Sequence, residues 1–169
     1  MTAALIGKNI VNKAISHIGE MECPAGSNSG PQVNRYLEYV GVDTAMPASE
    51  KAWCASFASY IIGMTLLQMA LKGAPHPNTA SSHEMVNWGI RNGTIIHDPK
   101  KALPGDVVVL AGGDGEAAED GKSYHHTLLL EYVRLDGLHC IAGNDGDMVR
   151  RNVRPFAGST ILRPYVSVA

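Results

Sequence analysis

Cys54 is the residue of this sequence that is best placed for chemistry. It follows Trp53 and opens a long apolar stretch that we expect to be helical, so its thiol would lie at a helix N-terminus. The unpaired N–H groups and the positive end of the helix dipole favour a thiolate there. The same N–H groups can stabilise the oxyanion that forms when a thiolate attacks a carbonyl. Cys54 is therefore a candidate nucleophile, although a buried cysteine also serves as an ordinary small apolar residue.

A cysteine nucleophile needs a base, and a pair of adjacent histidines offers one. His125 and His126 stand just before the apolar run 127–133, which we expect to be a strand. Because neighbouring residues of a strand face opposite sides of the sheet, only one of the two would face Cys54. We favour His126 and keep His125 as the alternative. Surface or structural roles are predicted for the other histidines, which are His17, His76, His83, His97 and His139.

A third polar residue would orient the imidazole by accepting its second N–H. Asn144 follows the run 138–142, which a turn at Asp136-Gly137 would join to the strand that begins near His126. If the two strands pair antiparallel, His126 and Asn144 are about equally far from the turn and lie side by side at the sheet edge. We therefore expect Asn144 in this role, with Asp145 as the alternative. Asn-Asp-Gly is also a common turn sequence, so a purely structural role stays open.

The first half of the chain predicts the helices that would carry Cys54. Apolar residues recur at three- and four-residue steps over 5–18 and again over 33–40, where Pro31 suits the first helical turn. The most apolar helix is expected over 53–72, and its apolar residues on all sides predict a central helix. A shorter helix follows, with Ser81 and Glu84 at capping-box spacing.

The second half predicts the sheet that would carry the histidine. Branched and aromatic residues concentrate in short segments separated by turn residues. Helices followed by an antiparallel sheet make an α+β fold, with the Cys54 helix packed on the sheet. The expected strands are 106–111, 127–133, 138–142, 148–153 and 161–166.

Composition indicates one ordinary globular domain. The chain has 169 residues, 45% of them hydrophobic and 18% charged, which suffices for a single domain over residues 1–169 with its own core. A net charge of −2 offers no basic surface for nucleic acid or for an anionic membrane. The three cysteines match no zinc or disulfide pattern, so at least one thiol is unpaired. Of the other two, Cys140 is expected in the core.

Neither a targeting segment nor a metal site is predicted. Residues 1–20 are too polar for a signal-peptide core, and the apolar stretch 55–71 is interrupted by polar residues and glycine, so we expect synthesis in the cytoplasm and no membrane insertion. The acidic loop 112–121 lacks the spacing of a calcium-binding loop, and we expect it to be a solvated connection. Its carboxylates are Asp114, Glu116, Glu119 and Asp120.

The order of these motifs resembles the CHAP domain (cysteine, histidine-dependent amidohydrolase/peptidase) and its NlpC-type relatives. The resemblance spans residues 15–153 and depends on the order and spacing of short motifs. It also extends to a subgroup of small bacterial and phage proteins, through Gly19-Glu20, Pro24, Gly26 and Asn28. The motifs are Trp53-Cys54, Leu103-Pro104-Gly105-Asp106 before a strand, His126 at the next strand, and Gly143-Asn144 after the third.

This resemblance implies a papain-like fold with the nucleophile at Cys54, the general base at His126 and the orienting residue at Asn144. Two positions depart from the family pattern. His125 stands where a small residue is common, which leaves the choice between the two histidines open. Ala142 stands where many CHAP domains have a glutamate, and Asp145 is the residue that would compensate.

The resemblance also implies a peptidoglycan hydrolase, either an amidase or an endopeptidase, that needs no cofactor. Such a protein would act at the cell wall as an antibacterial effector delivered by a secretion system, or as a phage lysin. An effector would have a cognate immunity protein in the producing cell. Two alternatives stay open: a cysteine protease or deamidase acting on a protein, and a non-catalytic wall-binding domain that keeps the fold.

Overall fold

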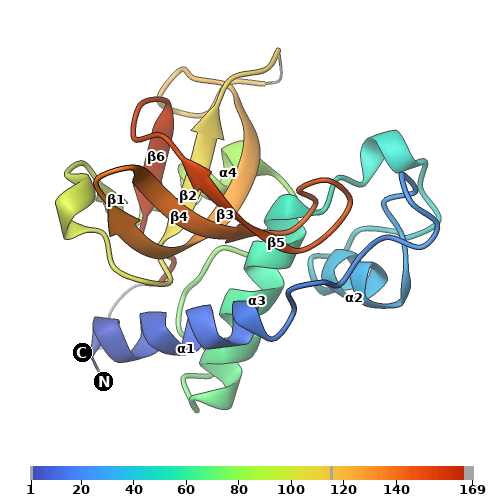
Figure 1. Ribbon diagram of the computed structural model, residues 1–169, viewed down its shortest axis with the longest axis horizontal. Helices are drawn as coiled ribbons and strands as arrows, with labels where there is room; N and C mark the ends of the chain where they lie inside the picture. Colours follow the sequence, from blue (N-terminus) through green and yellow to red (C-terminus); the bar gives the residue numbers. More distant parts are fainter. Residues whose placement is uncertain (1, 115, 166–169) are drawn as a thin grey trace.

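The computed structural model describes residues 2–114 and 116–165, in which four α-helices precede the main strands of one antiparallel sheet (Figure 1). The strand order is β1-β6-β2-β3-β4-β5, and each neighbouring pair is antiparallel. The predicted α+β fold is thus confirmed. The helices are α1 (Ala3–Ile15), α2 (Pro31–Tyr39), α3 (Cys54–Gln68) and α4 (Ser82–Arg91), and the short 3-10 helices are η1 (Ala48–Glu50) and η2 (Pro99–Lys101). The strands are β1 (Ile95–Ile96), β2 (Val107–Ala111), β3 (Tyr124–Arg134), β4 (Gly137–Ala142), β5 (Arg150–Arg154) and β6 (Ser159–Leu162).

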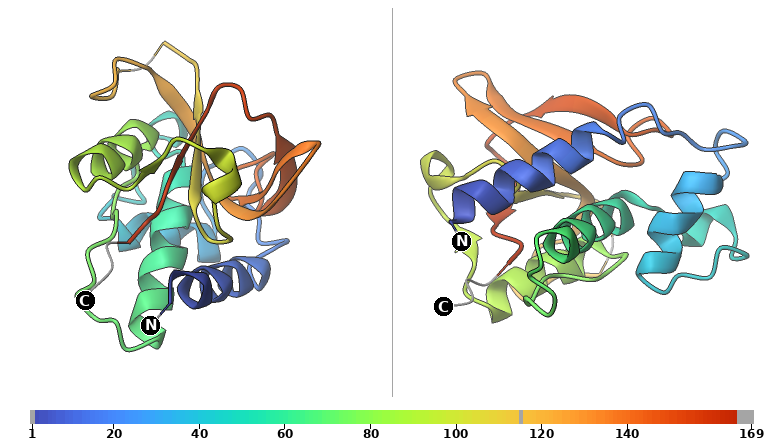
Figure 2. Two further views of the ribbon diagram at one scale, coloured as in Figure 1. Left: turned by 90° about the vertical axis from the view of Figure 1, so that its left-hand side faces the viewer. Right: turned by 90° about the horizontal axis from the view of Figure 1, so that it is seen from below.

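The two faces of the sheet bury different clusters of side chains. One face carries Val107, Val109 and Leu129, which pack against residues of α1, α3 and α4. Figure 2 shows these helices gathered on one side of the twisted sheet. The opposite face carries a smaller cluster contributed by the strands themselves, which includes Leu128 and Cys140. Successive residues of β3 therefore point alternately toward the helices and toward this strand cluster.

Helix α3 is the central helix of the domain, as predicted. Its buried residues occur on every side, because α1, α2 and the sheet all pack around it. The aromatic ring of Tyr36 contacts those of Trp53 and Phe57 where α2 meets the start of α3. This packing fixes the N-terminal end of α3 against the sheet, which is the end that carries Cys54.

β3 and β4 form the predicted antiparallel hairpin, but Arg134 pairs with Gly137, so the turn residues are Leu135 and Asp136 rather than Asp136 and Gly137. An irregularity between Leu130 and Tyr132 shifts the register by one residue, and the ladder ends at Leu129 opposite Ile141. The expected juxtaposition of His126 and Asn144 lies three residues beyond this last pair and stays a prediction. The main strands start and end within a few residues of their predicted limits. The last predicted strand, 161–166, is observed as Ser159–Leu162, and its final residue lies outside the described residues.

Two helix ends differ in detail from prediction. Helix α1 ends at Ile15 rather than near residue 18, because the Ser16 hydroxyl donates to the Lys13 carbonyl and the chain continues as turns. Ser81 caps α4 by accepting from the Glu84 N–H, but the Glu84 carboxylate accepts from Asn87 and does not complete the capping box. Within the described residues, every helix is too short or too polar to cross a bilayer.

Candidate active site

Cys54 is the first residue of α3, and only 6% of its surface is exposed. The helix start approaches the end of β4 closely because Gly143 has no side chain. A Cβ at that position would lie 2.6 Å from the Cβ of Phe57 and 2.7 Å from the Trp53 ring. Gly143 therefore lets α3 pack directly on the backbone that follows β4, and this packing sets the position of the thiol.

The Cys54 thiol is surrounded by hydrogen-bond donors. Its Sγ lies 3.9 Å from the Ser82 hydroxyl, which is hydrogen-bonded to the Thr127 hydroxyl at 2.8 Å. Burial raises the pKa of the thiol above its usual range. Hydrogen bonds from the Thr127 backbone, the Ser82 side chain and the backbone at Ala55 and Cys54 act in the opposite direction. The site thus provides donors for a negatively charged sulfur, but the resting thiol is protonated at neutral pH.

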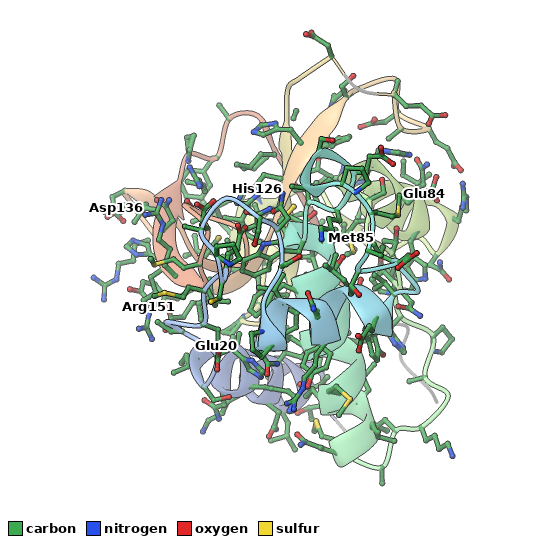
Figure 3. All side chains as sticks on the ribbon, turned by 90° about the vertical axis from the view of Figure 1, so that its right-hand side faces the viewer. Glu20, Glu84, Met85, His126, Asp136 and Arg151 are labelled. Carbon is green, nitrogen blue, oxygen red and sulfur yellow. The ribbon has the colours of Figure 1, made fainter. Side chains whose placement is uncertain are left out.

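His126 lies next to this contact, at the beginning of β3, and Figure 3 shows it near the middle of the molecule. It pairs with Leu110 of β2, next to the irregularity that contains His125. Burial lowers the pKa of the imidazole to about 4, an effect that the charge of Asp145 opposes and that of Arg154 supports. The imidazole is therefore neutral at pH 7 and able to accept a proton.

The thiol lies near the start of β3, beyond the point where β3 separates from β4. The β3–β4 ladder ends at Leu129 and Ile141, and two residues further on Thr127 is linked to Cys54 Sγ through the Ser82 hydroxyl. In the described part of the chain, no hydrogen bond joins the thiol to the His126 imidazole. Catalytic hydrogen bonds are often long in the free enzyme and shorten when substrate binds. The structure thus brings Cys54 to the residue beside His126 and leaves the Cys54–His126 pairing as a prediction.

The residues predicted to orient the imidazole separate into two roles. Asn144 adopts a positive φ of 53°, and its Nδ2 donates to the Asn28 Oδ1 at 2.9 Å. Asp145 is 7% exposed, and its charge acts on His126. We therefore favour Asp145, the alternative, as the residue that influences the base, and Asn144 as the residue that ties the turn to the loop around Asn28.

The two adjacent histidines also differ. The β2–β3 register shifts between Leu110, opposite His126, and Ala111, opposite Tyr124, which leaves His125 at the irregularity. His125 is exposed and lies over Gly112 and Gly113, away from the described neighbours of Cys54. These placements favour His126 over His125 as the base.

The other histidines have structural or surface positions and Cys140 lies in the core, as predicted. His139 is hydrogen-bonded to the Asp136 carboxylate and stacks on Tyr132, and His97 is exposed. Cys140 is buried in the strand cluster, and Cys23 is exposed. Three further imidazoles are hydrogen-bonded to hydroxyl groups: His17 to Tyr36, His76 to Tyr39, and His83 to Ser81.

A buried carboxylate that the sequence did not single out fixes Trp53, the residue before Cys54. Glu22 Oε1 accepts from the Trp53 Nε1 at 2.9 Å, and its Oε2 accepts from the Asn28 N–H at 2.9 Å. Glu22 is 5% exposed and Trp53 is fully buried. The loop 20–30 is thereby tied both to the start of α3 and, through Asn28, to the turn after β4.

Sequence reasoning also missed Ser82 and Thr127, whose hydroxyls lie beside the thiol. Their only sequence signals are positions next to a predicted helix cap and next to a candidate base. Residues 2–114 and 116–165 contain no group of three or more His, Cys, Asp or Glu side chains placed to hold a metal ion. In comparisons with known proteins, no family model matches this chain, and no curated protein matches it.

Proposed function

We propose that this protein is a cysteine hydrolase that cleaves an amide bond in the peptide part of peptidoglycan. The observation that carries the proposal is the link from Cys54 Sγ, at the start of α3, through the Ser82 hydroxyl to the hydroxyl of Thr127, the residue after His126. A nucleophile at a helix N-terminus and a neutral imidazole one residue from its contact are the parts that cysteine acyl transfer requires. Delivery as an antibacterial effector or as a phage lysin, and an immunity protein for an effector, belong to the same proposal.

In the proposed reaction, His126 takes the proton of the Cys54 thiol as the sulfur attacks the amide carbonyl carbon. A C–S bond forms, and the N–H groups at the start of α3 stabilise the oxyanion. The C–N bond then breaks as His126 gives its proton to the leaving amine. Water, deprotonated by His126, attacks the thioester and releases a carboxylic acid and the free thiol. The resting thiol and imidazole are both neutral, so the proton transfer accompanies the attack rather than precedes it.

The test is digestion of purified sacculi by the wild-type protein and by Cys54→Ala, with mass spectrometry of the released fragments. We expect soluble muropeptides from the wild type and at least about a 1,000-fold lower rate from the variant, because removal of a covalent nucleophile leaves little residual catalysis. Cys23→Ala is the matched control, since Cys23 is an exposed thiol outside this site. No fragments from folded wild-type protein would refute the wall hydrolase and leave a protein substrate or a binding function.

A further inference from the structure

Two arginines of β5 converge on Asp145, beside the candidate base. The Asp145 Oδ1 accepts from the Arg150 Nε and Nη2, at 3.1 and 2.6 Å. Its Oδ2 accepts from the Arg154 Nη2 and the Asn152 Nδ2, both at 2.8 Å. Alternate residues of a strand share a face, and so these β5 side chains lie on the same side of the sheet. The buried carboxylate thus holds two guanidinium groups in fixed positions.

The two guanidinium groups carry more positive charge than the Asp145 carboxylate neutralises, and more N–H donors than it accepts from. One carboxylate faces two guanidinium groups, each of which has five N–H donors. Among the described residues, Arg150 gives two of its N–H groups and Arg154 gives one to Asp145. The Nε of Arg154 is shielded from solvent without a hydrogen-bond partner in the described structure. The Arg150 side chain is 47% exposed and accessible to a ligand.

The cluster also lies at the proposed catalytic site. Asp145 lies in the turn after β4, and the β3–β4 ladder ends three residues from His126 on one strand and four from Asp145 on the other. The face of β5 that carries Arg150 and Arg154 pairs with Ala142 and Leu138, members of the strand cluster that also includes Leu128. The charges of Asp145 and Arg154 both act on the His126 imidazole. A ligand held by the two arginines would therefore lie beside the imidazole.

We propose that Arg150 and Arg154 bind a free carboxylate of the peptide substrate next to the scissile amide. This inference rests on the proposed hydrolase function and names the chemical class of its substrate, an acidic peptide. A planar guanidinium binds a carboxylate with paired N–H donors, and the fixed geometry imposed by Asp145 reduces the entropy lost on binding. Stem peptides whose carboxylates are amidated would lack the negative charge that this site recognises.

The test measures binding without turnover. In a Cys54→Ala background, calorimetry compares a wall stem peptide that has free carboxylates with the same peptide after amidation. We expect amidation to weaken binding at least tenfold. Arg150→Gln in this background should reduce the preference to less than about threefold, and Arg154→Lys should retain part of it. Circular dichroism verifies that each variant is folded.

Arg151→Gln is the matched control, because it removes the same charge from the adjacent residue of β5. Arg151 pairs with Glu131 on the other face, and Figure 3 shows it at the outer edge of the molecule. This variant should keep the tenfold preference. Equal binding of the two peptides, no binding of either, or an equal loss in Arg150→Gln and Arg151→Gln would each overturn the carboxylate site. A preserved preference in a protein that releases no wall fragments would uphold the site and refute the hydrolase.

Discussion

The surroundings of Cys54 and of His126, both at the beginning of β3, differ in their chemistry. On the helix side, Cys54 is buried beside the Ser82 hydroxyl, which is bonded to that of Thr127, with no charged group among its hydrogen-bond partners. Around His126, the charges of Asp145 and Arg154 act on the imidazole near a partly exposed arginine. The difference indicates a division of labour in the proposed enzyme: the neutral side protects and orients the nucleophile, and the charged side adjusts the base and receives substrate.

The test with the largest expected effect replaces each of the two adjacent histidines, one at a time. We expect His126→Ala to lower the rate of wall-peptide release by about 10²–10⁴-fold, which is the usual contribution of a general acid-base residue. His125→Ala should change the rate less than about threefold, because His125 is exposed at the strand irregularity. Rates are measured from soluble fragments released under identical conditions. The reverse order of effects would assign the base to His125 and contradict our choice.

A second test uses the pH dependence of stability. The pKa of His126 is about 4 in the folded protein, whereas an exposed imidazole has a pKa of 6.5. Between these values the unfolded state binds a proton that the folded state does not, so stability falls as the pH falls. His126 should account for up to about 3 kcal/mol of the loss between pH 7 and 4.5.

Urea unfolding at several pH values measures this contribution. His126→Gln should show a flatter dependence of the unfolding free energy on pH than the wild type. The variant must be compared with the wild type, because burial also lowers the pKa of His17. His17 therefore gives both proteins a dependence of the unfolding free energy on pH with the same sign. Identical slopes would mean that His126 is freely solvated, and the charged side would then lack a shielded base.

A third test weakens the support of the nucleophile rather than the site itself. Trp53→Phe removes the indole N–H and leaves Glu22 Oε1 buried without that donor. We expect the unfolding free energy to fall by about 2 kcal/mol, the cost of losing a hydrogen bond to a charged group. Trp88→Phe is the control: its indole is in no hydrogen bond of the described residues, and the loss there should be below about 1 kcal/mol. Equal losses would show that Glu22 contributes little to fixing α3.

The helix side of this comparison was more predictable from the sequence than the charged side. Apolar residues all round 53–72 predicted a central helix, and Cys54 at its start followed from that pattern. The Asp136-Gly137 signal predicted the β3–β4 hairpin, although the turn itself consists of Leu135 and Asp136. Both signals are local, and local patterns determine where helices and hairpins form.

Local sequence patterns could not distinguish the role of Asn144 from that of Asp145. They are adjacent residues of one turn, and their side chains are directed by partners elsewhere in the chain. Asn144 reaches Asn28, which lies 116 residues earlier, and Asp145 reaches the arginines of β5. The hydroxyl pair beside the thiol likewise joins residues from α4 and β3. Such contacts depend on tertiary packing, which no local pattern encodes.

The smallest expected effect belongs to Ser82, and it tests whether the neutral side does more than fill space. The Ser82 hydroxyl lowers the pKa of the Cys54 thiol, so Ser82→Ala should raise that pKa and reduce the thiolate fraction at a fixed pH. We expect alkylation by iodoacetamide at pH 8 to slow by about 3–10-fold, since only the thiolate reacts. A Cys23→Ser background removes the exposed thiol from the measurement, and Cys140 is buried.

Ser81→Ala is the informative comparison for Ser82, because the two serines are adjacent and only one lies beside the thiol. Ser81 caps α4 by accepting from the Glu84 N–H, so its loss should cost about 1 kcal/mol of stability and leave the alkylation rate unchanged. If both variants slow alkylation equally, Ser82 acts only by holding α4 in place. If Ser82→Ala alone slows it and shifts its pH profile upward, the hydroxyl beside the sulfur is a positioning residue for the nucleophile.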